Sequence, residues 1–410
     1  MSGSFVYTSA YTQKLTGENM KDTVLLFESR DLCYESNRYF IKCLKQAFES
    51  LGYPVEVCDL SLRMEEKLET VLAGQEKYMA ALDFNSLLPR MELEDGTPYL
   101  EAFQVPFYNY LVDHPLYHHV GIRCGFSHYS VICIDTCHQK YMQKYYPQIR
   151  QVYYLPLGAA EAQFEKELEQ KRFELLFLGT YEPEAALHEQ LEDYALPLKK
   201  EVSALIDMMD ADHALTQEDA LAAYLRDQGE VLTEAEFAVR LNHAYLADKY
   251  LRNLKRKKAV IAAEKSKIPF TVIGHGWDVL DELHHKQVTL YTGGVSYPVS
   301  IQMMADAKIL LNTTPCFHGG LHDRVYTAML NHTLAFTEDT PFSRNELADQ
   351  KEAVLYNDSD LDTLTEKLAD IYKHPAEIKS ITDHAYRKAQ AAYTWEHRAE
   401  IFFSGIHTDR

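Results

Sequence analysis

The segment from Lys308 to Glu338 combines an apolar run, a glycine-containing loop and a helical pattern that starts with basic side chains. The apolar run ends at Asn312, and His322 and Arg324 fall in the first turn of the predicted helix. The loop between them contains His318, Gly319 and Gly320. Free backbone N–H groups and the positive end of a helix attract anions, and an arginine can hold a phosphate through two parallel hydrogen bonds. The segment therefore predicts a diphosphate-binding site.

The elements that would position such a site begin in the N-terminal half of the chain. Short apolar runs, typical of buried parallel strands, alternate there with amphipathic segments. The helical pattern of residues 36–51 is followed by Gly52, as expected of a C-terminal capping glycine. The predicted strands cover residues 23–27, 55–58, 79–84, 105–112, 130–134 and 152–155. This alternation predicts a parallel, doubly wound α/β domain over residues 1–160.

The same strand and helix pattern starts again in the C-terminal half. The predicted strands cover residues 174–178, 270–273, 288–291, 309–311, 333–336 and 353–356. They predict a second Rossmann-like domain over residues 161–393, at whose carboxyl sheet edge a ligand would bind. Residues from about 183 to 252 have no strand signal and predict a helical insert. The basic cluster of residues 255–258 follows; we interpret it as a solvated helix face, with attraction of a phosphate or a membrane as the alternative.

The amino-acid composition limits which kinds of binding partner this protein can have. The chain has 410 residues, of which 46% are hydrophobic and 25% charged, enough for two globular domains. The net charge of −20 argues against nucleic acid or an anionic membrane surface as the main partner. No apolar run approaches the ~20 residues of a membrane span. The polar N-terminus lacks a signal-peptide core and the seven cysteines form no CxxC pair, so we expect a cytoplasmic protein without a membrane span.

Three groups of residues are candidates for metal ligands. Asp358-Ser359-Asp360 precedes a predicted helix, where Asp and Ser are ordinary capping residues. Asp210-Ala211-Asp212 lies inside the helical insert. Cys133, Cys137 and His138 lack the fourth ligand of a structural zinc site. We therefore expect no bound metal.

Three motifs of the C-terminal half resemble those of the GT-B glycosyltransferases, and more narrowly of the bacterial CgeB-like group. They are the stretch HGGLHDRVYTAMLNHTLAFTE after a strand, the GHGW turn after another strand, and the tail YTWEHRAEIF. The likeness covers roughly residues 173–403 without the helical insert. The N-terminal half is similar only in architecture and in its LVDHP segment. The resemblance implies that residues 394–410 form a helix that packs back on the N-terminal domain.

The resemblance also implies a nucleoside-diphosphate sugar as donor, held by the C-terminal domain without an essential metal or other cofactor. Arg324 would hold the phosphates, with His322 and the loop glycines beside it. Gly179 and Thr180 end the first strand of this domain, where a loop would approach the diphosphate or the sugar. A frame for the base would come from Gly274, His275, Gly276 and Trp277, although Trp277 fits a core position equally well. Where the group often has a ribose-binding Glu, this chain has Thr327, so the ribose contact would come from Asp323 or elsewhere.

Transfer with inversion needs a group that takes the proton of the acceptor hydroxyl. Asp113 ends a predicted strand of the N-terminal domain and is the first candidate, with His114 second. The alternative is that Asp113 only caps the turn before Pro115. Asp83 is a further candidate base at a strand end. Glu28 and Arg30 follow the first strand and fit solvated loop residues better than acceptor contacts.

These observations predict a glycosyltransferase that uses a hydroxyl on a protein, glycan or lipid-linked acceptor. By analogy with the CgeB-like group, the acceptor would be a bacterial surface protein, such as flagellin, or a surface glycan. The sequence contains no P-loop, no dinucleotide fingerprint after the first strand and no hydrolase nucleophile elbow. Two alternatives stay open: a non-catalytic protein that binds sugar nucleotides or glycans, and a sugar-nucleotide epimerase on the same scaffold.

Overall fold

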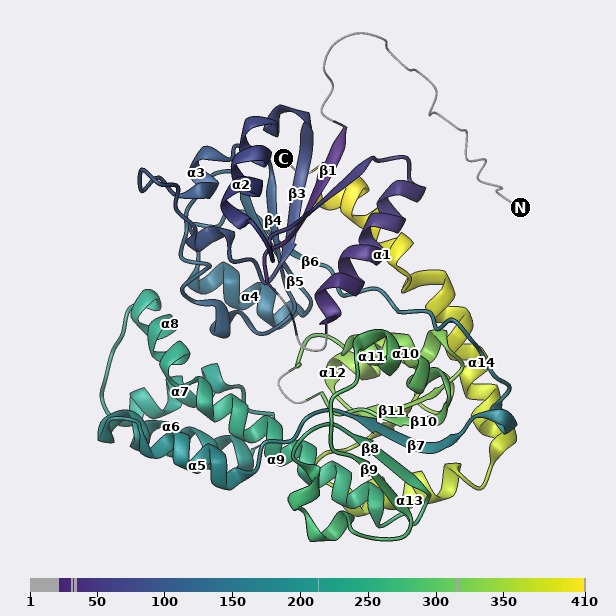
Figure 1. Cartoon of the computed structure of the whole chain (residues 1–410). Helices are drawn as coiled ribbons and strands as arrows, with labels where there is room; N and C mark the ends of the chain where they lie inside the picture. The colour runs from purple at the N-terminus through teal and green to yellow at the C-terminus, as the bar shows by residue number, and fades with distance from the viewer. Residues whose placement is uncertain (1–21, 31, 33–34, 213, 315–316, 409–410) are drawn as a thin grey trace, which may run out of the picture.

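The computed structural model describes residues 22–408 except 31, 33–34, 213 and 315–316. It contains two six-stranded sheets in which all neighbouring strands are parallel, one in each half of the chain. The expected α/β fold with two Rossmann-like domains is confirmed. Figure 1 shows the two domains facing each other, with the helices α10 and α11 of the C-terminal domain directed towards the N-terminal one.

The N-terminal sheet has the order β2-β1-β3-β4-β5-β6, so the strand order reverses between β1 and β3. Its strands are β1 Thr23–Glu28, β2 Val55–Asp59, β3 Tyr78–Phe84, β4 Phe107–Leu111, β5 Tyr129–Cys133 and β6 Val152–Tyr154. Its helices are α1 Ser36–Ser50, α2 Met64–Ala73, α3 Tyr99–Ala102 and α4 Thr136–Tyr145. Helix α1 packs on one face of the sheet and α2, α3 and α4 pack on the other. Both faces are buried, which explains the continuous apolar runs of the strands.

The C-terminal sheet has the order β12-β11-β10-β7-β8-β9, which reverses between β7 and β10. Its strands are β7 Phe173–Leu178, β8 Phe270–Ile273, β9 Val288–Tyr291, β10 Ala307–Leu311, β11 Leu334–Glu338 and β12 Val354–Tyr356. The helices after β9 are α10 Tyr297–Ala305, α11 Asp323–Leu330, α12 Pro341–Glu346, α13 Leu361–Ile371 and α14 Pro375–Ala392. Because ligands of such sheets bind where the strand order reverses, the loops after β7 and β10 are the expected binding loops.

Five helices separate β7 from β8, where the sequence predicts a helical insert. They are α5 Glu184–Glu192, α6 Leu196–Ala211, α7 Gln217–Asp227, α8 Glu234–His243 and α9 Tyr245–Glu264. The last helix runs past residue 252 because Ala259, Val260 and Ala263 pack on the C-terminal sheet together with α13.

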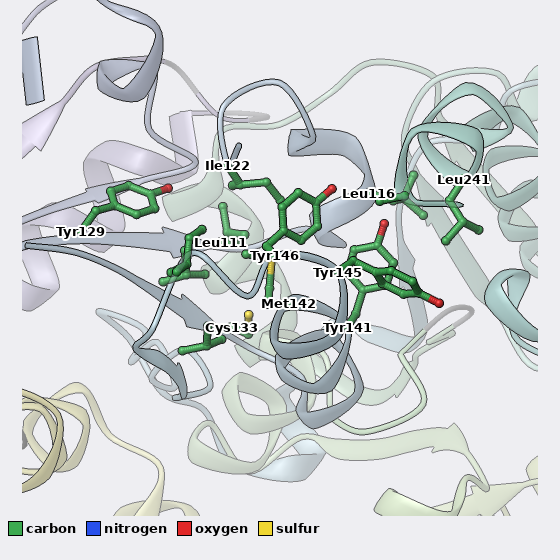
Figure 2. Close-up of a cluster of buried hydrophobic side chains, with 14 of the residues drawn as sticks. Leu111, Leu116, Ile122, Tyr129, Cys133, Tyr141, Met142, Tyr145, Tyr146 and Leu241 are labelled. Atoms are coloured by element: carbon green, nitrogen blue, oxygen red, sulfur yellow. The ribbon is translucent and has the colours of Figure 1, made fainter. Parts of the chain in front are cut away.

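The insert also packs against the N-terminal domain. The amide of Asn242 donates a hydrogen bond to the Leu116 carbonyl over 2.7 Å, and the rings of Phe237 and Tyr145 stack at 5.4 Å. Figure 2 shows Leu241 of the insert beside Leu116 and the tyrosines of α4, so one hydrophobic core continues from the N-terminal domain into the insert. The insert therefore connects the two domains on one side of the molecule.

The C-terminal end of the chain connects them again. Helix α15, Trp395–Ile401, and the following turn lie against α1, with Trp395 5.7 Å from Phe40 between ring centroids. Arg398 donates a hydrogen bond to the Leu157 carbonyl over 3.3 Å. A Cβ on Gly158 would lie 2.5 Å from the indole of Trp395, so only glycine fits at this crossing. The segment around Gly158 and the start of α15 both pass between the domains, and they are thus packed directly on each other.

Candidate functional site

A cleft of about 450 Å³ lies between the carboxyl edges of the two sheets. Its N-terminal wall contains Arg30, Asn85 and Asp113, which follow β1, β3 and β4. Its C-terminal wall comes from the loops after β7 and β8 and from the start of α11. Six of the predicted site residues line the cleft: Asp113, Gly179, Thr180, Gly274, His322 and Arg324. The predicted donor and acceptor sides therefore share one space.

The N-terminus of α11 forms the centre of the C-terminal wall. His322 is the residue before the helix, and its Nδ1 lies 2.5 Å from the Asp323 carboxylate. The Arg324 guanidinium donates to the Leu178 carbonyl over 2.5 Å and lies 3.3 Å from His322 Nε2. Nδ1 also lies 3.4 Å from the Arg324 backbone N. Because its contact with Asp323 is shorter, we infer that Nδ1 carries a proton and donates it to the Asp323 carboxylate. Nε2 is then left to accept from Arg324, which fixes the guanidinium in the cleft.

The charges around Arg324 are also set by this geometry. Burial lowers the pKa of His322, and the nearby Arg324 lowers it further, so the imidazole is neutral at neutral pH. Burial alone would raise the pKa of Asp323, but His322, the Tyr297 hydroxyl at 2.5 Å and Arg324 hold it well below its usual range. Asp323 is thus an anion already bound to Tyr297 and His322.

Arg256 is a second cation of the same wall, and the sequence did not single it out. It projects from α9 into the cleft and donates to the Thr180 carbonyl. Its neighbours in the basic cluster form ion pairs: Lys255 with Asp358 at 3.3 Å, Lys257 with Glu184 at 2.5 Å and Lys258 with Asp210 at 2.7 Å. The loop after β7 therefore orients two guanidinium groups, because Arg324 binds Leu178 and Arg256 binds Thr180. The basic run was the only signal for Arg256.

The GHGW turn, residues 274–277, packs directly against the loop after β7. Gly274 has φ +143° and Gly276 φ +84°, and a Cβ on either would lie within 2.2 Å of a backbone oxygen of the β7 loop. Trp277 is 1% exposed, donates to the Gly179 carbonyl over 2.6 Å and stacks on Tyr181. Of the two alternatives for Trp277, the core position fits the structure and the base-stacking role does not, because its ring is buried. His275 is exposed, and its Nε2 accepts from the Gly294 N–H at 3.1 Å.

The loop glycines before α11 contact the N-terminal domain. Gly319 donates to the Asp135 carboxylate over 2.8 Å and accepts from the Thr136 N–H at 2.9 Å. A Cβ on Gly319 would lie 2.3 Å from the Thr136 hydroxyl, and one on Gly320 would lie 2.9 Å from the Ile134 carbonyl. Both glycines therefore permit close contact between the domains. This placement corrects the predicted role beside the diphosphate, since neither lines the cleft.

The two predicted bases point into different spaces. Asp113 is half-exposed in the cleft, where its carboxylate accepts from the Asn85 amide at 2.8 Å. His114 lines a separate cavity of about 50 Å³ together with His138 and His318. Its Nδ1 accepts from the Leu116 N–H at 3.1 Å, and burial lowers its pKa. His114 and His318 are therefore not on the cleft, which leaves Asp113 as the candidate base.

Comparison with known proteins matches this architecture. Residues 252–404 match the family model described as glycosyl transferase-like. Sucrose-phosphate synthase from Thermosynechococcus elongatus superposes with a TM-score of 0.56 at 10% identity, covering 94% of this chain and 98% of that chain. The chain therefore has the GT-B fold, and its residues 252–404 are similar to a glycosyl transferase-like family. The narrower likeness to the CgeB-like group stays a prediction.

Two further GT-B structures cover nearly the whole chain. An alpha-glucosyltransferase in complex with UDP and a 13-mer DNA containing a HMU base has a TM-score of 0.53 at 9% identity and covers 94% of this chain and 99% of that chain. The Anabaena protein HepE in complex with UDP and glucose has a TM-score of 0.50 at 9% identity, with coverage of 94% and 99%. None of the curated proteins matches the chain.

Two predicted positions of this GT-B protein have structural partners away from the cleft. Asn312 is fully buried; its side-chain amide donates to the Thr337 hydroxyl over 2.9 Å, and its backbone carbonyl accepts from the Tyr356 hydroxyl. The predicted donor contact of Asn312 is therefore not supported by its position. Thr327 is also fully buried and accepts from the Ala160 N–H at 3.1 Å. Its hydroxyl holds the segment between the domains in place.

Asp83, the further candidate base, is a core residue of β3. It is 1% exposed and does not line the cleft, and burial raises its pKa to about 7. Within the described residues, no three His, Cys, Asp or Glu side chains are grouped so that they would hold a metal ion. No helix in the described part of the chain has both the length and the apolar character needed to cross a membrane.

Proposed function

We propose that this GT-B protein is a glycosyltransferase that moves a sugar from a nucleoside diphosphate to an acceptor hydroxyl. The observation that carries the proposal is the shared cleft: Arg324 at the N-terminus of α11 and Arg256 of α9 on one wall, and Asp113 on the other. A diphosphate fits the first group by charge and by the fork geometry of guanidinium. Structures of the same fold are complexes with UDP, one of them also with glucose, which supports a nucleotide-sugar donor.

The chemical step uses both walls. The acceptor oxygen forms a bond to the anomeric carbon of the sugar, and the bond from that carbon to the phosphate oxygen breaks. The electron pair leaves with the diphosphate, whose growing charge is stabilised by Arg324, Arg256 and the N–H groups of α11. Asp113 takes the proton of the acceptor hydroxyl. This course inverts the anomeric configuration.

We further propose that transfer proceeds without an essential metal, because the two guanidinium groups and the helix terminus supply positive charge where the diphosphate leaves. The acceptor would be a protein, glycan or lipid-linked molecule, and a bacterial surface protein or glycan is the class that the resemblance suggests. Chelation with EDTA should therefore leave the rate within about twofold of its original value.

A donor hydrolysis assay tests the proposal. The nucleoside-diphosphate sugar that most raises the melting temperature, among UDP-, GDP-, CDP- and dTDP-sugars, is incubated with the protein without acceptor. A transferase releases nucleoside diphosphate slowly, and the R324A variant should not. Binding without release would indicate a sugar-nucleotide-binding protein, and conversion of the sugar without release would indicate an epimerase. Either result would contradict the proposal.

A further inference from the structure

Arg30 stands on the N-terminal wall of the cleft, and its charge has no partner among the residues that the structure describes. It follows β1, is exposed and lines the cleft on the same wall as Asp113. Glu28, at the end of β1, is bound by Arg38 at 2.8 Å. No ion pair or hydrogen bond joins the Arg30 side chain to another residue within the described part of the chain. Its guanidinium is therefore available to a ligand.

A second arginine, Arg90, adds positive charge around His118. Arg90 ends the short helical turn Leu88–Arg90, and its Nε lies 3.4 Å from where a Cβ of Gly121 would be. Arg30 and Arg90 both act on His118, whose Nε2 lies 3.9 Å from the Asp113 carboxylate. Burial lowers the pKa of His118, the carboxylate of Asp113 raises it, and the two arginines lower it. The result is a pKa of about 4. The imidazole is thus neutral, and the positive charge that acts on it comes from the guanidinium groups of Arg30 and Arg90.

Arg30 is a positive charge in a chain whose net charge is −20. Several arginines elsewhere pair with carboxylates, as Arg240 does with Glu201 at 2.8 Å. The donor diphosphate is already matched by Arg324 and Arg256 on the opposite wall. An unpaired guanidinium beside the candidate base is therefore suited to the other substrate. Guanidinium binds carboxylates and phosphates through parallel hydrogen bonds.

We propose that the acceptor carries an anionic oxygen group, a phosphate or a carboxylate, and that Arg30 binds this group while the reacting hydroxyl faces Asp113. The proposal rests on the proposed function, because it assigns the chemistry of the second substrate of the same cleft. Arg90 contributes charge without direct contact. Because Arg30 is exposed, binding of the anion weakens as ionic strength rises.

The test is titration calorimetry with inorganic phosphate on protein saturated with the nucleoside diphosphate of the best donor, so that the donor site is filled. Phosphate should bind the wild type, and the R30Q variant should bind it about tenfold more weakly or worse. R30K should retain part of the affinity. R63Q is the matched control, because Arg63 is 74% exposed on the same domain and pairs only with Glu66 at 3.5 Å; it should bind phosphate like the wild type. Glucuronate and glucose 6-phosphate then show whether a carboxylate or a phosphate is preferred.

Three results would overturn the proposal: no phosphate binding by the nucleotide-saturated wild type, equal binding by R30Q, or loss of nucleotide affinity in R30Q. The last would place Arg30 in the donor site. Failure of the proposed function is seen separately, as absence of nucleotide release from the donor sugar by the wild type.

Discussion

Replacing Arg324 with alanine should abolish donor binding at ordinary concentrations. Two of its N–H groups are held by Leu178 and His322, other donors of the guanidinium remain, and the residue lines the cleft. Each charge-assisted hydrogen bond to a phosphate contributes about 1.5–3 kcal/mol. Loss of a bidentate pair should therefore cost about 3–6 kcal/mol, which weakens the dissociation constant by roughly 10²-fold to about 10⁴-fold.

Titration calorimetry with the best nucleoside diphosphate measures this change. The R324K variant keeps the charge but loses the planar fork, so its affinity should lie between those of R324A and the wild type. R344A is the matched control, because Arg344 lies in α12 of the same domain, is 61% exposed and pairs with Asp339 at 2.6 Å. It should bind like the wild type. An R324A protein that folds normally and binds within about twofold of the wild type would refute the assignment of the diphosphate site.

Three other changes have defined outcomes. D113N should keep the donor affinity but lower the transfer rate by about 10²–10⁴, measured as glycosylated product; normal turnover would exclude the base role. Burial raises the pKa of Glu338 from 4.5 to about 7, so its contribution to stability is fully present below pH ~4.5 and is lost as the pH rises through about 7. E338Q should therefore be more stable than the wild type at pH 8, by up to about 3 kcal/mol, with the difference shrinking towards pH 5 in denaturant titrations; equal stability at pH 8 would contradict the shift. G158A should lower the melting temperature, with a cost of about 1–3 kcal/mol, because the added methyl meets the Trp395 indole at 2.5 Å.

The sequence predicted the fold well because both sheets are parallel and buried on both faces. Their strands are short apolar runs ended by polar or glycine residues, and the helices between them carry one apolar stripe. Arg324 was found for the same local reason. It lies in the first turn of a helix that follows a buried strand, and the carboxyl edge of the sheet determines what it faces.

The remaining site predictions depended on contacts between segments far apart in the sequence. Trp277 is core because its indole reaches the loop after β7, and Gly319 is needed where the domains touch. Asp113 and His114 are neighbours, yet the turn after β4 sends them into separate cavities. Arg256 is one of four consecutive basic residues, and only the packing of α9 decides which of them enters the cleft. None of these contacts has a local signal.

The central claim is that the donor diphosphate lies between Arg324 and Arg256 and that the acceptor side of the same cleft carries Asp113. A crystal structure of the protein with the nucleoside diphosphate of its best donor tests this most directly. We predict diphosphate oxygens within hydrogen-bonding distance, about 3 Å, of both guanidinium groups and of the first N–H groups of α11. A nucleotide bound elsewhere, or a diphosphate that contacts neither arginine, would contradict the account.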